Sequence, residues 1–223
     1  MEQEADWIWV SDDDAYLKDD ALKQASDYLE EQPDLDKISA ICGKVIKNGK
    51  MDINHGKYYY KKGIRICEAS IPAEMYEKKE FEMGSFTYVG TIMNKKKLLE
   101  AGLPNKDYFI YWDDLEHGIR MRKAGKIIGV PGIVAYHDVG EEGSGINWKL
   151  YYSYRNMIDT YRKHFSGVCY DYFCLKIRVK IFLNHMTGHK KLEMNILEEA
   201  FKNARQQKFG LHPVYRPGWK PGE

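Results

Sequence analysis

The chain has few cysteines, no long apolar run and no clear excess of charge of either sign. Its four cysteines, in 223 residues, form no CxxC pair and no zinc-finger spacing, and a chain of this length does not depend on disulfides. Its 34 basic and 33 acidic side chains nearly cancel, and 43% of its residues are hydrophobic. This composition excludes disordered and collagen-like chains and indicates a globular protein with reduced thiols, as in the cytoplasm.

A leader and a membrane span are also not predicted. The amino terminus, MEQEADWIWV, is acidic where a secretion signal is basic, and no apolar run approaches the roughly 20 residues of a spanning helix. Charge is unevenly distributed, however, because residues 147–223 carry 14 Lys and Arg against 6 Asp and Glu. Such a region favours an anionic neighbour, or is simply the solvated face of helices. No nucleic-acid partner is predicted.

Apolar periodicity predicts an α/β region over 1–146 and a helical extension over 147–223. Strands are expected at 7–10, 39–46, 86–93, 127–130 and 133–136, and residues 58–62 are expected to form a loop. Helices are expected at 20–32, 95–101, 111–124 with Gly125 as a left-handed stop, 148–164, 170–186 and 192–207. Residues 175–181 alternate with period two, so a strand is an alternative there.

Three carboxylates follow the first predicted strand, which is expected to be buried on both faces. In an extended chain Asp12 and Asp14 point the same way, with Asp13 between them. Two carboxylates so placed can hold Mg²⁺ or Mn²⁺ and leave positions open for phosphate oxygens. The alternative is a solvated acidic turn that caps the next helix.

A second acidic group, Trp112-Asp113-Asp114-Leu115-Glu116, opens a predicted helix. The helix N-terminus offsets part of the repulsion among its carboxylates, and a carboxylate there can serve as a general base. Glu116 and Arg120 are four residues apart and can pair along the helix, which favours an orienting role for Glu116. The alternative is an acidic cap on a surface helix.

His137 ends the last predicted strand. A lone histidine after a strand is more often a satisfied core or surface residue than a metal ligand. Together with the acidic groups at the ends of other strands, it becomes a candidate nitrogen ligand that completes the aspartate pair.

Combined in this order, these motifs resemble the family 2 glycosyltransferases of GT-A fold, in particular the rhamnosyltransferase and galactofuranosyltransferase branch. The matching segments are 7–14, 90–93, 111–116 with Arg120, 124–137 and 151–156. The resemblance spans about residues 6–165. One departure is His117, where the family usually has an aromatic ring.

The resemblance implies a role for each matching residue. Asp12, Asp14 and His137 would hold a divalent metal, Mg²⁺ or Mn²⁺, and Asp13 would contact the donor. Asp114 would be the general base that deprotonates an acceptor hydroxyl for inverting attack on the anomeric carbon. The predicted acceptor-binding residues are Trp112, Asp113 and Glu116.

The resemblance also implies an activity and its partners. The expected function is transfer of a sugar from a nucleotide-diphosphate donor to a glycan or lipid-linked acceptor in surface-polysaccharide or cell-wall synthesis, at the cytoplasmic membrane face. In the family, βαβ units that bind the nucleotide precede the Asp-rich strand, and each such unit takes roughly 30 residues. Only six residues precede Trp7, so the nucleotide-binding half is expected to come from an upstream segment. The alternatives are a non-catalytic remnant that binds a glycan or a partner, and a metal-dependent phosphoesterase, which usually has more histidine ligands.

Overall fold

The computed structural model describes residues 4–140 and 145–222. The chain divides into two compact units, which are described separately. The sheet unit comprises Met1–Tyr59, Glu68–Pro104 and Asp114–Glu142. The helical unit comprises Tyr60–Cys67, Asn105–Asp113 and Gly143–Glu223, so it draws on two stretches before the predicted extension. The domain boundary at residue 146 stays a prediction.

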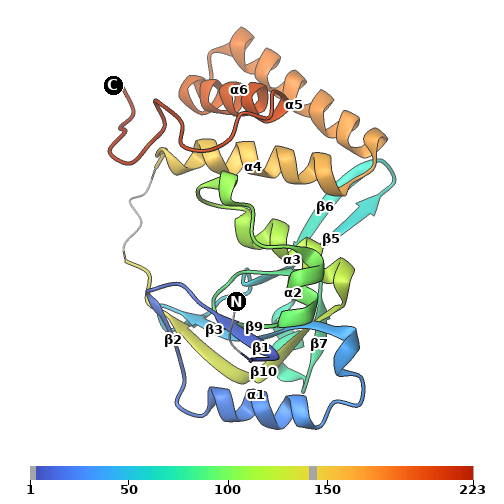
Figure 1. Cartoon of the computed structure of the whole chain (residues 1–223). Coiled ribbons are helices and arrows are strands. Elements are labelled where there is room, and N and C mark those ends of the chain that lie inside the picture. The colour runs from blue at the N-terminus through green and yellow to red at the C-terminus, as the bar shows by residue number, and fades with distance from the viewer. Residues whose placement is uncertain (1–3, 141–144, 223) are drawn as a thin grey trace. The chain divides into compact units, whose positions relative to one another are not determined.

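The sheet unit is built on a mixed sheet whose main strands run in the order β1-β9-β3-β10-β2 (Figure 1). Strands β3 and β10 are parallel, whereas β9 is antiparallel to both β1 and β3, and β2 is antiparallel to β10. Short strands β4 and β7 pair with β3 and β10. The bounds are β1 Trp7–Val10, β2 Ala15–Leu17, β3 Ile38–Lys47, β4 Lys50–Met51, β7 Phe81–Met83, β9 Thr91–Asn94 and β10 Lys126–His137.

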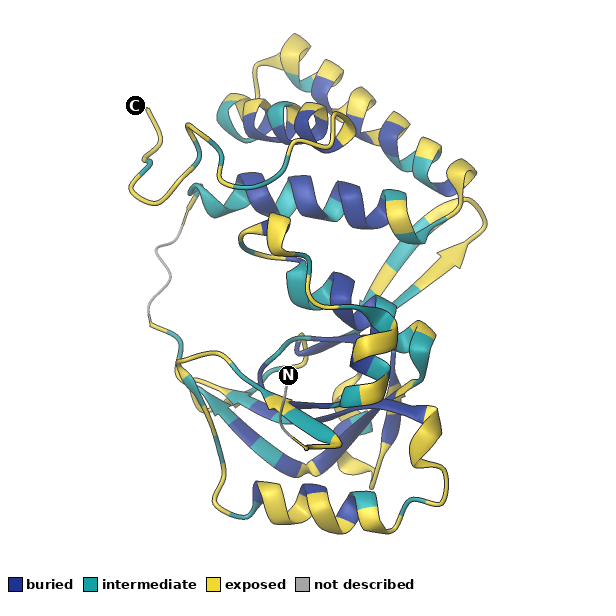
Figure 2. Cartoon of the chain, viewed as in Figure 1, coloured by how far each residue is buried: buried dark blue, intermediate teal, exposed yellow. Residues whose placement is uncertain are grey.

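Successive side chains along these strands point to opposite faces of the sheet, and both faces are apolar. On one face, Ile41 and Ile128 pack in a cluster with Tyr28 of helix α1 (Ala21–Glu30). On the other, Ala40 and Ile127 belong to a cluster that includes residues of α2 (Lys95–Ala101) and α3 (Asp113–Ala124). Helices on both faces thus exclude water from the central strands (Figure 2).

The connection from β1 to β2 requires a strongly curled sheet. These two strands stand at opposite ends of the strand order. In a flat sheet they would be separated by four interstrand spacings of about 4.8 Å each. Five residue steps join Val10 to Ala15, and they reach about 17 Å only when fully extended. The segment also contains a turn, in which the amide of Ala15 donates to the carbonyl of Asp12. The acidic turn therefore crosses the strand ends of a curled sheet.

Several predicted strands differ from those observed. Strand β1 is not buried on both faces, because it ends the sheet path and Trp9 is 41% exposed. The predicted strand 86–93 is interrupted by Gly90, whose φ of 66° turns the chain between β8 (Ser85–Phe86) and β9. The two strands predicted at 127–136 are one strand, β10, whose register shifts between Gly129 and Val134. Such an irregularity accommodates Pro131 inside a sheet.

A second sheet forms where a loop was predicted. Residues 58–62 lie in β5 (Gly56–Lys62), the central strand of the order β6-β5-β8, with β6 at Arg65–Ser70. Lysine-rich and tyrosine-rich sequence therefore extends as a strand because neighbouring strands satisfy its backbone. Within residues 4–140 and 145–222 there are also three short 3₁₀ helices, at Leu35–Lys37, Ala73–Glu77 and Lys106–Tyr108.

Helix α3 ends at Ala124 as predicted, but its start and the conformation of the glycine after it differ from the prediction. It begins at Asp113 rather than 111, because Tyr111 and Trp112 have left-handed φ angles of 62° and 69°. Gly125 after it is not left-handed. A side chain there would stand 2.8 Å from the carbonyl oxygen of Lys37, so close backbone packing requires the glycine.

The helical unit contains α4 (Lys149–His164), α5 (Gly167–Thr187) and α6 (Lys191–Arg205). Ile158, Ile177 and Leu197 bring the three helices into one apolar cluster. The strand alternative at 175–181 is wrong, since these residues lie within α5. Among the described residues, no helix combines the length and the apolar character needed to cross a membrane.

Candidate metal centre and acceptor motif

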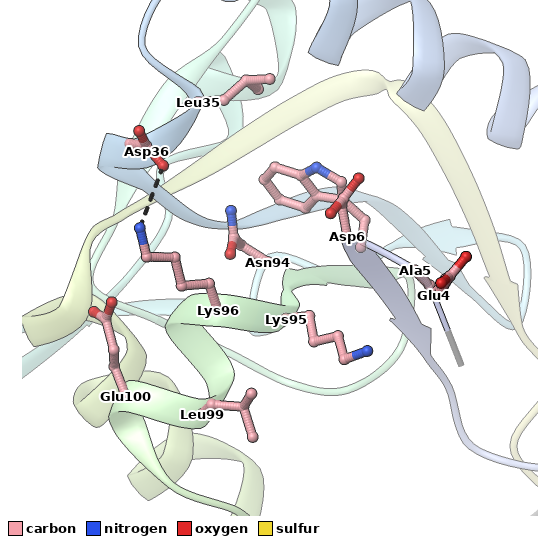
Figure 3. A pocket seen from close by; sticks show the side chains of 11 residues that line it. Glu4, Ala5, Asp6, Leu35, Asp36, Asn94, Lys95, Lys96, Leu99 and Glu100 are labelled. Atoms are coloured by element: carbon pink, nitrogen blue, oxygen red, sulfur yellow. Dashed lines mark ion pairs between the residues drawn. The ribbon is translucent and has the colours of Figure 1, made fainter. Parts of the chain in front are cut away.

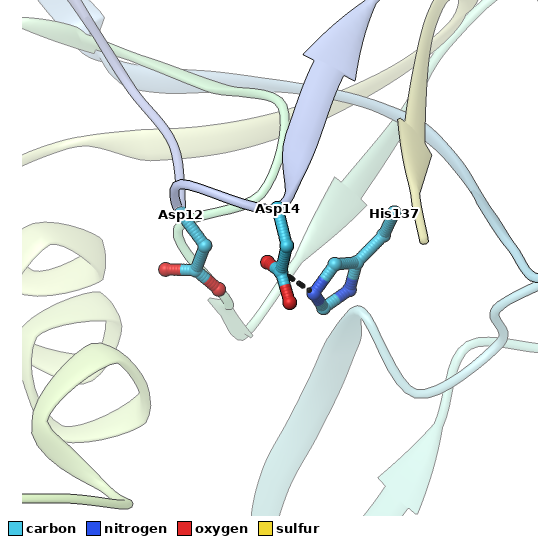
Figure 4. A group of neighbouring side chains, drawn as sticks. All are labelled: Asp12, Asp14 and His137. Atoms are coloured by element: carbon cyan, nitrogen blue, oxygen red, sulfur yellow. Dashed lines mark hydrogen bonds and ion pairs between the residues drawn. The ribbon is translucent and has the colours of Figure 1, made fainter. Parts of the chain in front are cut away.

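Asp12, Asp14 and His137 come together at the carboxyl edge of the sheet (Figure 4). One ligand atom from each lies within 4.8 Å of the others, and His137 Nε2 is 3.1 Å from Asp14 Oδ1. Both aspartates are exposed, and the His137 ring is mostly covered. The predicted convergence of the three residues is confirmed, although 123 positions separate Asp14 from His137.

Strand pairing holds this group together. In the β2–β10 ladder His137 stands opposite Ala15, the residue after Asp14. The amide of Asp138 also donates to the carbonyl of Asp14, at 3.1 Å. On the other side of β10, the amide of Asn48 donates to the carbonyl of His137. The backbone on both sides of the imidazole is therefore fixed before any ligand binds.

The three candidate ligand residues fit a divalent cation. Two carboxylates and one imidazole suit Mn²⁺ well, and the hard oxygens also suit Mg²⁺. Exposure of both aspartates leaves room for further oxygen ligands. Asp13 lies in the same turn but is not a member of the group of three, so its donor contact stays a prediction.

His55 was not found by the sequence reasoning and lies near this centre. It is fully buried, and its Nδ1 is 2.6 Å from Thr87 Oγ1. Burial lowers the pKa of His55 to about 4, although the nearby charge of Asp52 acts in the opposite direction. His55 is therefore neutral at pH 7. Its position, directly before Gly56 of β5, carries no local motif that would have identified it.

Asp114 lies in the first turn of α3, where its Oδ1 accepts the amide of Leu115 at 2.6 Å. Ser85 Oγ donates to the carbonyl of Leu115, which ties this turn to β8. A carboxylate at a helix N-terminus benefits from the positive end of the helix dipole. The sheet unit thus fixes the backbone that carries the candidate base.

Glu116 is buried and paired. It is 3% exposed, and Arg120 Nε donates to both of its carboxylate oxygens, at 3.1 and 3.0 Å. The same guanidinium donates to the carbonyl of Ala101, the last residue of α2, and to those of Gly102 and Leu103 just after it. This geometry favours the orienting role of Glu116 over the predicted acceptor contact.

Trp112 and Asp113 belong to the helical unit, in the segment 105–113. The side-chain amide nitrogen Nδ2 of Asn156 donates to the backbone carbonyls of Tyr108, Ile110 and Tyr111, at 2.9, 3.0 and 2.8 Å. Trp112 is 8% exposed, and its ring meets Tyr161 edge to face. The tryptophan therefore anchors this segment, and the acceptor contacts of Trp112 and Asp113 stay predictions.

Buried polar residues of α4 support the same segment. Arg155, 1% exposed, donates to the carbonyls of Tyr108 and Gly210. Asp159, fully buried, accepts the hydroxyl of Tyr108 at 2.8 Å and pairs with Arg162 at 2.7 Å. Asp159 was missed by the sequence reasoning, because a single acid on an amphipathic helix normally indicates a solvated position.

Comparisons with known proteins address the fold. No family model matches the chain. Over 117 residues it is 26% identical to galactofuranosyltransferase GlfT2 of Mycolicibacterium smegmatis, covering 44% of this chain and 18% of that protein. It superposes on the crystal structure of GalNAc-T7 with UDP, GalNAc and Mn²⁺ with a TM-score of 0.51 and 11% identity. That match covers 91% of this chain and 40% of GalNAc-T7, so the chain spans less than half of either relative.

The fold is that of a GT-A glycosyltransferase. The α/β prediction with a helical extension is thereby confirmed. The order of elements explains why the triad forms: in this fold the acidic turn and the end of the last strand meet at one edge of the sheet. The galactofuranosyltransferase similarity agrees with the predicted branch without establishing it.

The departure at His117 has a structural explanation. The ring is fully buried, with edge contacts to Phe86 and Tyr88, and its Nδ1 is 3.1 Å from the Tyr88 hydroxyl. Burial, with the nearby charge of Arg120, lowers the pKa of His117 to about 4. The residue therefore packs as a neutral ring in an aromatic cluster.

A separate pocket of about 920 Å³ lies where β1 begins (Figure 3). Trp7, Asn94 and Lys95 line it, together with Asp36 and Lys96, which form an ion pair at 3.8 Å. None of the predicted site residues lines this pocket. It lies at the amino end of β1, whereas the triad follows the carboxyl end.

Proposed function

We propose that this chain is the metal-binding and acceptor-side part of an inverting glycosyltransferase that moves a sugar from a nucleotide-diphosphate donor to a glycan or lipid-linked acceptor. The observation that carries the proposal is the convergence of Asp12, Asp14 and His137 at the carboxyl edge of a GT-A sheet. The similarity to a galactofuranosyltransferase supports a hexosyl-type transfer in surface-polysaccharide or cell-wall synthesis.

The triad would hold Mg²⁺ or Mn²⁺. A divalent cation there would neutralise the diphosphate as the sugar is transferred. GalNAc-T7, which shares the fold, was crystallised with UDP and Mn²⁺, and this supports a nucleotide-sugar donor. Asp13, exposed in the same turn, is proposed to contact the donor.

Asp114 is proposed as the general base. Its carboxylate takes the proton of an acceptor hydroxyl, whose oxygen forms a bond to the anomeric carbon while the bond to the diphosphate oxygen breaks. The amide of Leu115 orients one carboxylate oxygen of Asp114. Glu116 and Arg120 fix the helix behind it, because their pairing also joins α3 to the segment after α2.

A nucleotide-binding segment upstream of β1 is part of the proposal. It is supported by the position of β1, which ends the described sheet path and exposes Trp9. An unpaired strand edge readily accepts a further strand. Trp112 and Asp113 are proposed to contact the acceptor, and the basic helices of the extension are proposed to contact a membrane peripherally, on its cytoplasmic face.

Binding of Mn²⁺ to this chain tests the proposal directly. Titration followed by the electron paramagnetic resonance of free Mn²⁺ should show one site, and UDP should strengthen that site. Asp14→Asn and His137→Gln should each weaken Mn²⁺ binding at least about tenfold, as loss of one ligand predicts. The matched control is Asp19→Asn, which neutralises an exposed carboxylate outside the triad.

Absence of Mn²⁺ binding, with and without UDP, would refute the proposal. So would Mn²⁺ binding that Asp14→Asn and Asp19→Asn weaken equally, since that result indicates only a general attraction of cations to acidic groups.

A further inference from the structure

Helix α5 (Gly167–Thr187) has two apolar faces, and the described chain covers only one of them. The covered face includes Cys174, Ile177 and Ile181, each at most 8% exposed, which pack against α4 and α6. The other face, here named the outer stripe, is exposed along the helix, as Figure 2 also shows. Its large side chains are Val168 at 64%, Leu175 at 56%, Val179 at 47%, Phe182 at 62%, Leu183 at 53% and Met186 at 71% exposed.

The outer stripe has the geometry of one continuous surface. At about 100° per residue, its six side chains fall within an arc of about 100°, centred opposite the covered face. The helix is 21 residues long, which corresponds to about 31 Å at 1.5 Å per residue. A helix that is apolar on two faces normally has both of them buried. The outer stripe therefore requires a partner of its own.

Basic residues border the outer stripe on both sides. Lys176 and Lys180 lie along one border and Arg178 along the other, and all three are exposed. Asp171 is the one acidic residue of α5. The ammonium group of Lys176 lies over the ring of Tyr172, and that of Lys180 is 3.8 Å from a carboxylate oxygen of Glu193 in α6. Flexible lysine and arginine side chains of this kind place their charges at a lipid headgroup layer.

Resting on the peripheral membrane contact that is part of the proposed function, we propose that the outer stripe of α5 makes this contact by docking on the surface of an anionic lipid bilayer. The helix lies parallel to the membrane plane, with Phe182 and Met186 in the acyl boundary and Lys176 and Arg178 at the headgroup phosphates. Charge complementarity distinguishes this partner from a second copy of the chain, whose outer stripe would bring the same basic borders into opposition.

Co-sedimentation with vesicles tests the docking without any sugar, nucleotide or metal, so its result is independent of the transferase proposal. The protein should bind vesicles containing phosphatidylglycerol at least about tenfold more strongly than vesicles of phosphatidylcholine alone. Binding should fall at 1 M salt, where the Debye length shrinks to about 3 Å. The double variant Lys176→Gln/Arg178→Gln should weaken it about 25-fold, because each basic residue near such a surface contributes about fivefold.

A second variant examines the apolar contact. Phe182→Ser/Met186→Ser removes two exposed side chains and should weaken vesicle binding by about 100-fold or more. Its far-ultraviolet circular dichroism and melting temperature should match the wild type, since neither side chain is buried. The control Leu22→Ser, at a 59% exposed leucine of α1, should bind as the wild type does.

Equal binding to neutral and anionic vesicles would overturn the proposal, as would no binding to either. A concentration-dependent dimer that the Phe182→Ser/Met186→Ser variant abolishes, without vesicle binding, would instead assign the outer stripe to self-association.

Discussion

Replacing Asn156 by aspartate should release the segment that carries Trp112 and Asp113. The side chain is fully buried, and its amide nitrogen donates to three backbone carbonyls, those of Tyr108, Ile110 and Tyr111. Aspartate keeps the shape of the side chain but directs an oxygen at those carbonyl oxygens. The variant thus removes the donor without creating a cavity.

The expected loss of folding stability follows from the hydrogen bonds of Asn156 and from the backbone conformation of the segment. Two amide hydrogens serve the three carbonyls, so two buried hydrogen bonds are lost, at about 1–3 kcal/mol for each acceptor left without a partner. The same segment has left-handed φ angles at Phe109, Tyr111 and Trp112, each of which costs about 1–2 kcal/mol for a residue with a side chain. We therefore expect Asn156→Asp to destabilise the helical unit by about 3 kcal/mol.

Urea unfolding followed by circular dichroism measures this effect. With a slope of about 1.5 kcal/mol per molar, the midpoint should fall by about 2 M. Trypsin should also cleave faster after Lys106, which is exposed in the segment that Asn156 holds. Asn195→Ala, at an exposed position of α6, is the control and should change stability by less than about 0.5 kcal/mol. An Asn156→Asp midpoint equal to that of the wild type would show that these hydrogen bonds do not hold the segment.

Two further predictions concern the proposed base and the buried histidines. In the assembled enzyme that carries the nucleotide pocket, Asp114→Asn should lower transfer by about 10²–10⁴-fold while the fold is kept; turnover within a few-fold of wild type would shift the role to Asp113. Because His55 and His117 have pKa values of about 4 in the folded chain, the unfolded state binds more protons between pH 4 and 6.5, and stability should fall as pH falls through that window. His117→Phe should therefore reduce the loss of unfolding free energy between pH 7.5 and 5 by about 2 kcal/mol, measured by denaturation at both pH values, and an unchanged loss would contradict the assignment.

Local signals in the sequence determined most of the elements. Apolar periodicity located the helices over 20–32 and 95–101 to within two residues, because side chains that repeat every three or four positions need only one covering surface. The order of acidic and aromatic motifs identified the fold before any strand was paired. The candidate ligands Asp12 and Asp14 are two positions apart in the sequence, and their proximity needs no tertiary information.

Tertiary structure alone decided how His137 meets them, since register between β2 and β10 sets that distance and no local pattern encodes register. It also decided that β1 ends the described sheet path and that 58–62 is a strand, because a strand exists only where a neighbour satisfies its backbone. The outer stripe of α5 shows the same limit. Residues 175–181 of this predicted helix alternate with period two, which left a strand as an alternative. Only packing against α4 and α6 separated the covered apolar face from the exposed one.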